Sequence, residues 1–127
     1  MRIDNYYVVG LIYQYMRERL KPPVFGLDIA EFDHRCFAIS ACEQMIEVIK
    51  GGALLTSVMG VDALFHYQTE KLDNWACSVK SKGVSFFYST QRDILLDLRD
   101  YIIGNLESEF PRSYPVRRYK KKKGDSK

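Results

Sequence analysis

The sequence has few cysteines and no long apolar run, and both shortages narrow the class of protein. Three cysteines, Cys36, Cys42 and Cys77, cannot all pair with one another, which favours a reducing, cytoplasmic setting over a disulfide-stabilised secreted domain. No stretch of about 18 apolar residues occurs, so the sequence predicts no membrane-spanning helix and no membrane partner. Residues 1–20 become polar at Gln14, and we expect an amphipathic helix there rather than a signal peptide.

The motifs that carry catalysis or cofactor binding are also missing. The chain has no glycine-rich phosphate loop, no paired-histidine zinc motif and no nucleophile elbow. Its two histidines and three cysteines lack the spacing of zinc ligands, so His34 and Cys36 are expected to form a polar turn beside a small buried thiol. We therefore predict a protein without metal or cofactor that acts by binding and is not an enzyme.

The sequence does contain enough apolar material for one folded domain. Of its 127 residues, 46% are hydrophobic and 13% aromatic, which is typical of a chain with its own core. Apolar residues recur from Tyr6 to Phe110, and Pro111 and Pro115 then oppose further helix. The sequence predicts a single domain over residues 1–110 and a flexible basic tail over residues 111–127.

Within this domain, residues 49 positions apart in the chain resemble one another. Ser40 aligns with Ser89 and Phe37 with Phe86, and similar apolar positions follow each serine. Because a serine side chain can accept hydrogen bonds from the free amides of a first helical turn, each serine is expected to cap a helix. The pattern suggests that one small structural unit is duplicated within the sequence.

The two predicted units cover residues of about 5–50 and 54–108. Trp75, Cys77 and Val79 alternate with smaller or polar residues, and this period of two is typical of a strand. The resulting prediction is an α+β fold, a tandem duplicated α-β-β-α unit whose antiparallel strands are covered by helices.

The alternative fold is an all-α helical bundle in which residues 28–50 form one continuous helix. Asp28 would cap this helix, with Glu31 in capping-box register. We favour the α+β fold because residues 75–89 contain turn-forming and β-branched residues that are unusual in the interior of a helix.

Charge is divided unevenly along the chain. Residues 1–111 hold 11 Lys and Arg against 15 Asp and Glu, a net charge of −4, whereas residues 112–127 hold 8 against 1, a net charge of +7. Basic side chains neutralise phosphates and an interleaved tyrosine can stack on bases, so the tail predicts nucleic-acid contacts. The candidate residues are Arg117, Arg118, Tyr119, Lys120, Lys121, Lys122 and Lys123.

The acidic body offers a second mode of binding. Tyr6 and Tyr13 are seven residues apart and share a helix face, so they are candidate anchors for a partner. Acidic residues on two helix faces would complement a basic protein surface; they are Glu43, Glu47, Asp93, Asp97 and Asp100. We predict an accessory nucleic-acid-associated factor, with a phage- or mobile-element-type inhibitor or adaptor as the alternative, and a protein partner or homodimer in either case.

Overall fold

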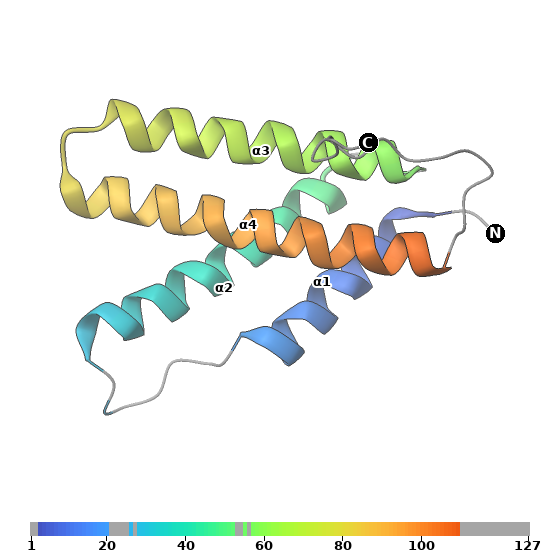
Figure 1. Ribbon diagram of the computed structural model, residues 1–127, viewed down its shortest axis with the longest axis horizontal. Coiled ribbons are helices and arrows are strands. Elements are labelled where there is room, and N and C mark those ends of the chain that lie inside the picture. The colour runs from blue at the N-terminus through green and yellow to red at the C-terminus, as the bar shows by residue number, and fades with distance from the viewer. Residues whose placement is uncertain (1–2, 21–25, 27, 53–54, 56, 110–127) are drawn as a thin grey trace, which may run out of the picture.

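The computed structural model describes residues 3–20, 26, 28–52, 55 and 57–109, and these residues form four α-helices. The helices are α1 (Asn5–Arg19), α2 (Ile29–Lys50), α3 (Val58–Ser78) and α4 (Lys82–Glu109). α3 and α4 run antiparallel and side by side, while α1 and α2 form a second pair that crosses α4 at an angle (Figure 1). Among the described helices α4 contacts each of the other three, whereas α3 lies against α4 alone.

The predicted α+β fold is wrong, and the all-α alternative is correct for the described part of the chain, which contains no strand. Asp28 caps α2 as that alternative requires, because its side chain accepts a hydrogen bond from the Glu31 amide at 2.8 Å. In place of the first expected hairpin the structure has the beginning of α2, and in place of the second it has the end of α3 and the beginning of α4, joined by residues 79–81. α2 ends at Lys50, before the Gly51–Gly52 pair, as expected of glycines that follow a helix.

The strand-like stretch around residue 80 was misread because a short turn there lies between two long helices. α3 ends at Ser78 and α4 begins at Lys82, so turn-forming residues are needed only between them. Trp75 and Cys77 are exposed, while Ala76 between them is buried, so the apolar alternation does not mark a buried strand face. The Ser89 hydroxyl donates to the Phe86 carbonyl at 3.2 Å, which accommodates a serine inside a helix.

An Asp or Ser directly precedes each of the four described helices, and its side-chain oxygen accepts a hydrogen bond from the amide three residues later. Ser40 and Ser89, the caps expected from the sequence, instead lie inside α2 and α4, so that expectation is wrong. Such caps satisfy amides that have no partner within the helix. The capping pairs are Asp4–Tyr7 (2.8 Å), Asp28–Glu31 (2.8 Å), Ser57–Gly60 (3.0 Å) and Ser81–Val84 (3.3 Å).

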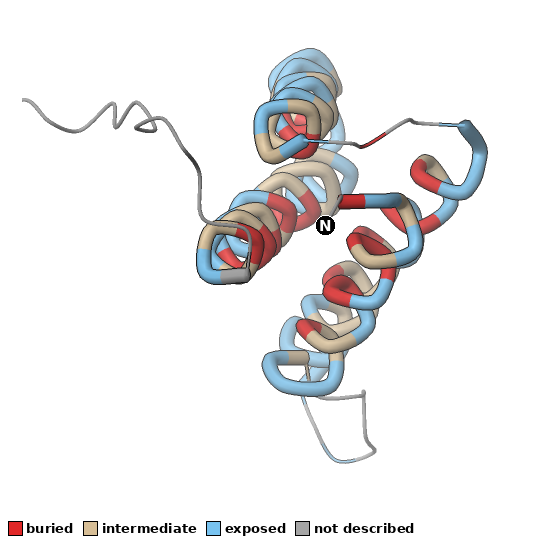
Figure 2. The backbone as a smooth tube through the Cα atoms, turned by 90° about the vertical axis from the view of Figure 1, so that its right-hand side faces the viewer, coloured by how far each residue is buried: buried red, intermediate tan, exposed pale blue. Residues whose placement is uncertain are grey.

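The core is built around the apolar face of α4. Leu95, Leu98, Ile102 and Leu106 are buried at the three- and four-residue spacing that places side chains on one side of a helix. Figure 2 shows the buried positions of the helices turned toward one another. The other helices supply Val8, Ile12 and Tyr15 from α1, Met45 and Ile49 from α2, and Val61, Phe65 and Leu72 from α3.

Leu98→Ala should lower the free energy of unfolding by about 2–5 kcal/mol, because it removes a fully buried side chain from the central helix. Leu96→Ala is the matched control on the same helix, since Leu96 is 44% exposed, and it should cost about 0.5 kcal/mol or less. Urea denaturation followed by circular dichroism measures both. Equal losses for the two variants would contradict this placement of α4.

Ser57→Ala should destabilise the protein by about 1 kcal/mol through loss of the α3 cap. Ser89→Ala should cost roughly 0.5 kcal/mol or less, because Ser89 lies inside α4 and its hydroxyl bonds only to a carbonyl of its own helix. Thermal melts of the two variants compare them directly. A larger loss for Ser89→Ala would support the capping role expected from the sequence and contradict the helix boundaries.

Candidate functional site

The three α4 aspartates that are candidates for partner binding all take part in ion pairs with arginines. An aspartate that is paired with an arginine offers less negative charge to a basic partner surface, because the arginine balances part of it. Their role in partner binding stays a prediction, and part of their charge is already balanced within the chain. The pairs are Asp93–Arg92 (3.0 Å), Asp97–Arg19 (3.3 Å) and Asp100–Arg99 (2.8 Å).

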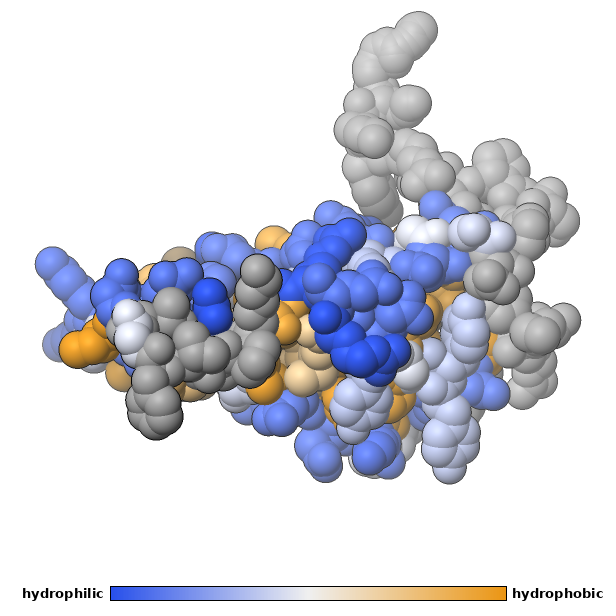
Figure 3. All heavy atoms as spheres, turned by 90° about the horizontal axis from the view of Figure 1, so that it is seen from below, coloured by the Kyte–Doolittle hydropathy of each residue, from blue (hydrophilic) through white to orange (hydrophobic). Residues whose placement is uncertain are grey.

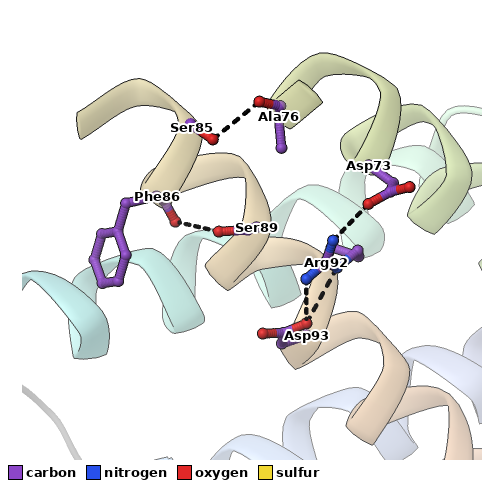
Figure 4. A network of polar contacts seen from close by, with 7 residues as sticks. All are labelled: Asp73, Ala76, Ser85, Phe86, Ser89, Arg92 and Asp93. Carbon is purple, nitrogen blue, oxygen red and sulfur yellow. Dashed lines mark hydrogen bonds and ion pairs between the residues drawn. The ribbon is translucent and has the colours of Figure 1, made fainter. Parts of the chain in front are cut away.

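Two of these arginines also join α4 to α3. Arg92 donates to Asp73 of α3 as well as to Asp93 (Figure 4), and hydrogen bonds to these two carboxylates raise the pKa of Arg92. Arg99 likewise donates to Asp62 of α3. Arg92 and Arg99 thus link α4 to α3 and at the same time pair with Asp93 and Asp100 of their own helix.

Asp97 belongs to a polar network between α1 and α4. The buried Tyr15 donates its hydroxyl hydrogen to Asp97 at 2.7 Å, and burial together with this hydrogen bond raises the pKa of Tyr15. The Arg19 guanidinium lies over the Tyr101 ring, 5.0 Å from its centroid. These contacts fix the angle at which α1 crosses α4, so Asp97 has a structural role.

Glu43 and Glu47 of α2, by contrast, lie beside Tyr13 of α1 around a hollow of about 360 Å³. Both glutamates are exposed, and within the part of the chain that the structure describes neither forms an ion pair. Figure 3, seen from the side of α1 and α2, shows a mostly hydrophilic surface with small hydrophobic areas between the polar side chains. The remaining lining residues are Ser40, Gln44 and Ile46.

Tyr6 and Tyr13 both reach the surface of α1, with exposed fractions of 87% and 45%. Gly10 lies between them along the same helix face, and nothing lies within 4 Å of the point that a Cβ atom on Gly10 would occupy. The backbone of α1 is therefore open to a partner between two aromatic rings. The structure brings Tyr13 to the two glutamates and leaves Tyr6 about two helical turns away along α1.

The predicted nucleic-acid contacts lie outside the described residues. They are Arg117, Arg118, Tyr119, Lys120, Lys121, Lys122 and Lys123, and their role stays a prediction.

His34 and Cys36 lie inside α2, so the polar turn expected there is wrong. The described residues contain no group of three or more His, Cys, Asp or Glu placed to hold a metal ion. Cys42 is buried, and burial raises the pKa of its thiol to about 12. Cys77, which the sequence placed in a strand with Trp75 and Val79, is instead an exposed residue of α3.

Sequence reasoning missed a second, basic hollow of about 220 Å³ between the end of α1 and the first half of α2. Arg19, His34 and Arg35 line it, together with Leu20 and Ala38. Arg19 is paired with Asp97 and Arg35 with Glu31, so their charge is partly neutralised. No signal in the sequence could have found this hollow, because its residues come together only through the angle between α1 and α2.

Comparison of the chain with protein-family models, with curated proteins and with solved structures finds no match. Within the described residues, no helix carries an apolar stretch long enough to cross a bilayer. The function therefore has to be argued from the surface chemistry of the helices.

Iodoacetamide should modify Cys77 much faster than Cys42, and peptide mass spectrometry after brief labelling can rank them. At about pH 8 a thiol with a pKa near 12 is ionised in roughly one molecule in ten thousand, and only the thiolate reacts. Urea-denatured protein is the control, in which both cysteines should react at similar rates. Rapid labelling of Cys42 in the folded protein would contradict its buried position.

Proposed function

We propose that this protein acts by binding, without catalysing a reaction, and that its α1–α2 face holds a basic segment of a protein partner. The observation that carries the proposal is the contrast between carboxylates. Those of Asp93, Asp97 and Asp100 are bonded to arginines, whereas those of Glu43 and Glu47 face a hollow without a cationic partner among the described residues.

The chemistry of the hollow suits a lysine or arginine side chain. Two carboxylates at positions i and i+4 of α2 lie one helical turn apart, so they can accept hydrogen bonds from one guanidinium or from two neighbouring cations. The half-exposed Tyr13 ring supplies a face on which a cation can rest. Ile46, buried at the base, can contact the aliphatic part of a long basic side chain.

Binding of this kind is that of an inhibitor or adaptor, of the type that phages and mobile elements encode. The basic tail supports a second candidate function, an accessory nucleic-acid-associated factor, because residues 112–127 carry a net charge of +7. The two functions use separate parts of the chain and can be tested separately.

The double variant Glu43→Gln/Glu47→Gln should bind a basic peptide about tenfold more weakly than the unmodified protein. The probe is a fluorescein-labelled peptide with Lys or Arg at alternate positions, and fluorescence anisotropy gives its dissociation constant. Two partly exposed charge contacts of about 0.5–1 kcal/mol each account for a change of this size.

Asp93→Asn/Asp100→Asn is the matched control, because it removes the same two negative charges from carboxylates that are already paired with arginines. Its affinity for the peptide should stay within about twofold of the unmodified protein, since only long-range electrostatics change. Equal weakening by both double variants would show that net charge alone attracts the peptide and would overturn the α1–α2 site.

Replacing Lys120, Lys121, Lys122 and Lys123 by glutamine tests the second function and leaves the hollow intact. If the tail contacts phosphates, the slope of log K against log salt for a single-stranded oligonucleotide should fall by roughly 0.7 for each lysine lost. An unchanged slope would place any nucleic-acid contact elsewhere on the protein.

A further inference from the structure

Large apolar side chains are exposed together at one end of the molecule. They come from the first turns of α2, the last turns of α3 and the first turns of α4, which lie at the same end in Figure 1. Contiguous exposed apolar residues with polar neighbours mark sites of association more often than scattered single residues do. The residues are Ile29, Phe32, Trp75, Val84 and Phe86, with exposed fractions between 39% and 80%.

An unbroken series of ring contacts joins α3, α4 and α2 at this end, and its two end members, Trp75 and Phe86, belong to the exposed surface. Trp75 contacts Tyr88, Tyr88 contacts Phe87, Phe87 contacts Phe37, and Phe37 contacts Phe86, with centroids 4.8–6.0 Å apart. Figure 4 shows the Phe86 ring projecting from α4 away from α3. Rings held by one another lose little conformational freedom when a partner covers them, which favours binding.

Opposite charges flank the two halves of this surface. The beginning of α2 carries Asp28, Glu31 and Asp33, of which Glu31 is paired with Arg35, whereas the connection from α3 to α4 and the first turn of α4 carry Lys80 and Lys82. Among the described residues no ion pair joins the acidic group to the basic group. The acidic half and the basic half thus have complementary charges, but they form no ion pair with each other within the described part of one chain.

We propose that a second copy of this chain covers this end. In the dimer the first turns of α2 in one copy pack on the α3–α4 turn of the other copy, and a two-fold axis repeats the contact. Ile29 and Phe32 of one copy then meet Val84 and Phe86 of the other, with acidic residues against lysines at the edge. A two-fold interface requires such a self-complementary surface.

Burial of the apolar centre away from water supplies the affinity of the dimer, and the charged edge sets the orientation of the two copies. A partner with a single charged patch would complement only the acidic half or only the basic half. A second copy presents both charges and complements both halves at once. This surface is separate from the hollow formed by Tyr13, Glu43 and Glu47, so the dimer does not depend on the proposed function.

Two charge-reversal variants of the full chain test the dimer. The lysine variant is Lys80→Glu/Lys82→Glu, which makes both halves of the surface acidic, and the acid variant is Glu31→Lys/Asp33→Lys, which makes both halves predominantly basic. Neither variant changes Asp28, the cap of α2. Sedimentation equilibrium at micromolar concentration measures the mass of each protein alone and of an equimolar mixture.

The unmodified protein should have twice the monomer mass, and each variant alone should dimerise at least about tenfold more weakly because like charges now face each other. The equimolar mixture should recover the dimer, since an acidic surface then meets a basic one. Circular dichroism melts check that each variant is folded.

Phe86→Ser provides a measurement that does not depend on charge and should also weaken the dimer at least about tenfold. Met59→Ser is its control, because Met59 is exposed at the opposite end of α3, and it should leave the mass unchanged. A monomeric unmodified protein would overturn the proposal and assign the surface to a different partner. Dimers that survive both reversals, or a mixture that stays monomeric, would overturn it as well.

Discussion

The apolar face of α4 is the feature on which the rest of the structure depends. α1, α2 and α3 all pack against this one helix, and its buried leucines and isoleucine form the common centre of the core. Burial of such side chains contributes about 1.5–3 kcal/mol for each of them, far more than an exposed ion pair does. The arginine–aspartate contacts between α4 and α3 therefore orient a helix that the apolar face already holds.

How far the fold could be predicted depends on which signals act locally. Asp28 with Glu31, and the Gly51–Gly52 pair, mark the two ends of α2 in the sequence, because caps and glycine exits depend on a few neighbouring residues. The region around residue 80 failed because strand-like alternation and turn-forming residues coincide there with the end of one helix and the start of the next. Only the packing of α3 on α4, which buries Ala76 and exposes Trp75 and Cys77, decides between the two interpretations.

The candidate site shows the same division between local and non-local information. Sequence spacing was sufficient to place Tyr6 with Tyr13, and Glu43 with Glu47, on helix faces, and all four side chains are exposed. It could not distinguish these glutamates from the aspartates of α4, because Arg19 is distant in the chain from Asp97 and only the crossing of α1 over α4 brings them together. Tertiary packing therefore decides the pairing of Asp97 and forms the basic hollow between α1 and α2, whereas Asp93 and Asp100 pair with arginines adjacent to them in the sequence.

α3 packs on a single neighbour, and its contact with α4 is the most extensive between any two of the described helices. Its buried residues, such as Val61, Phe65 and Leu72, form one narrow stripe, and its polar links to α4 are partly exposed and weakened by salt. Bringing two helices together costs less conformational entropy when the loop that joins them is short. α3 and α4 thus form a helical hairpin joined by residues 79–81, and its packing closes a shorter loop than any contact of α1 with α4 does.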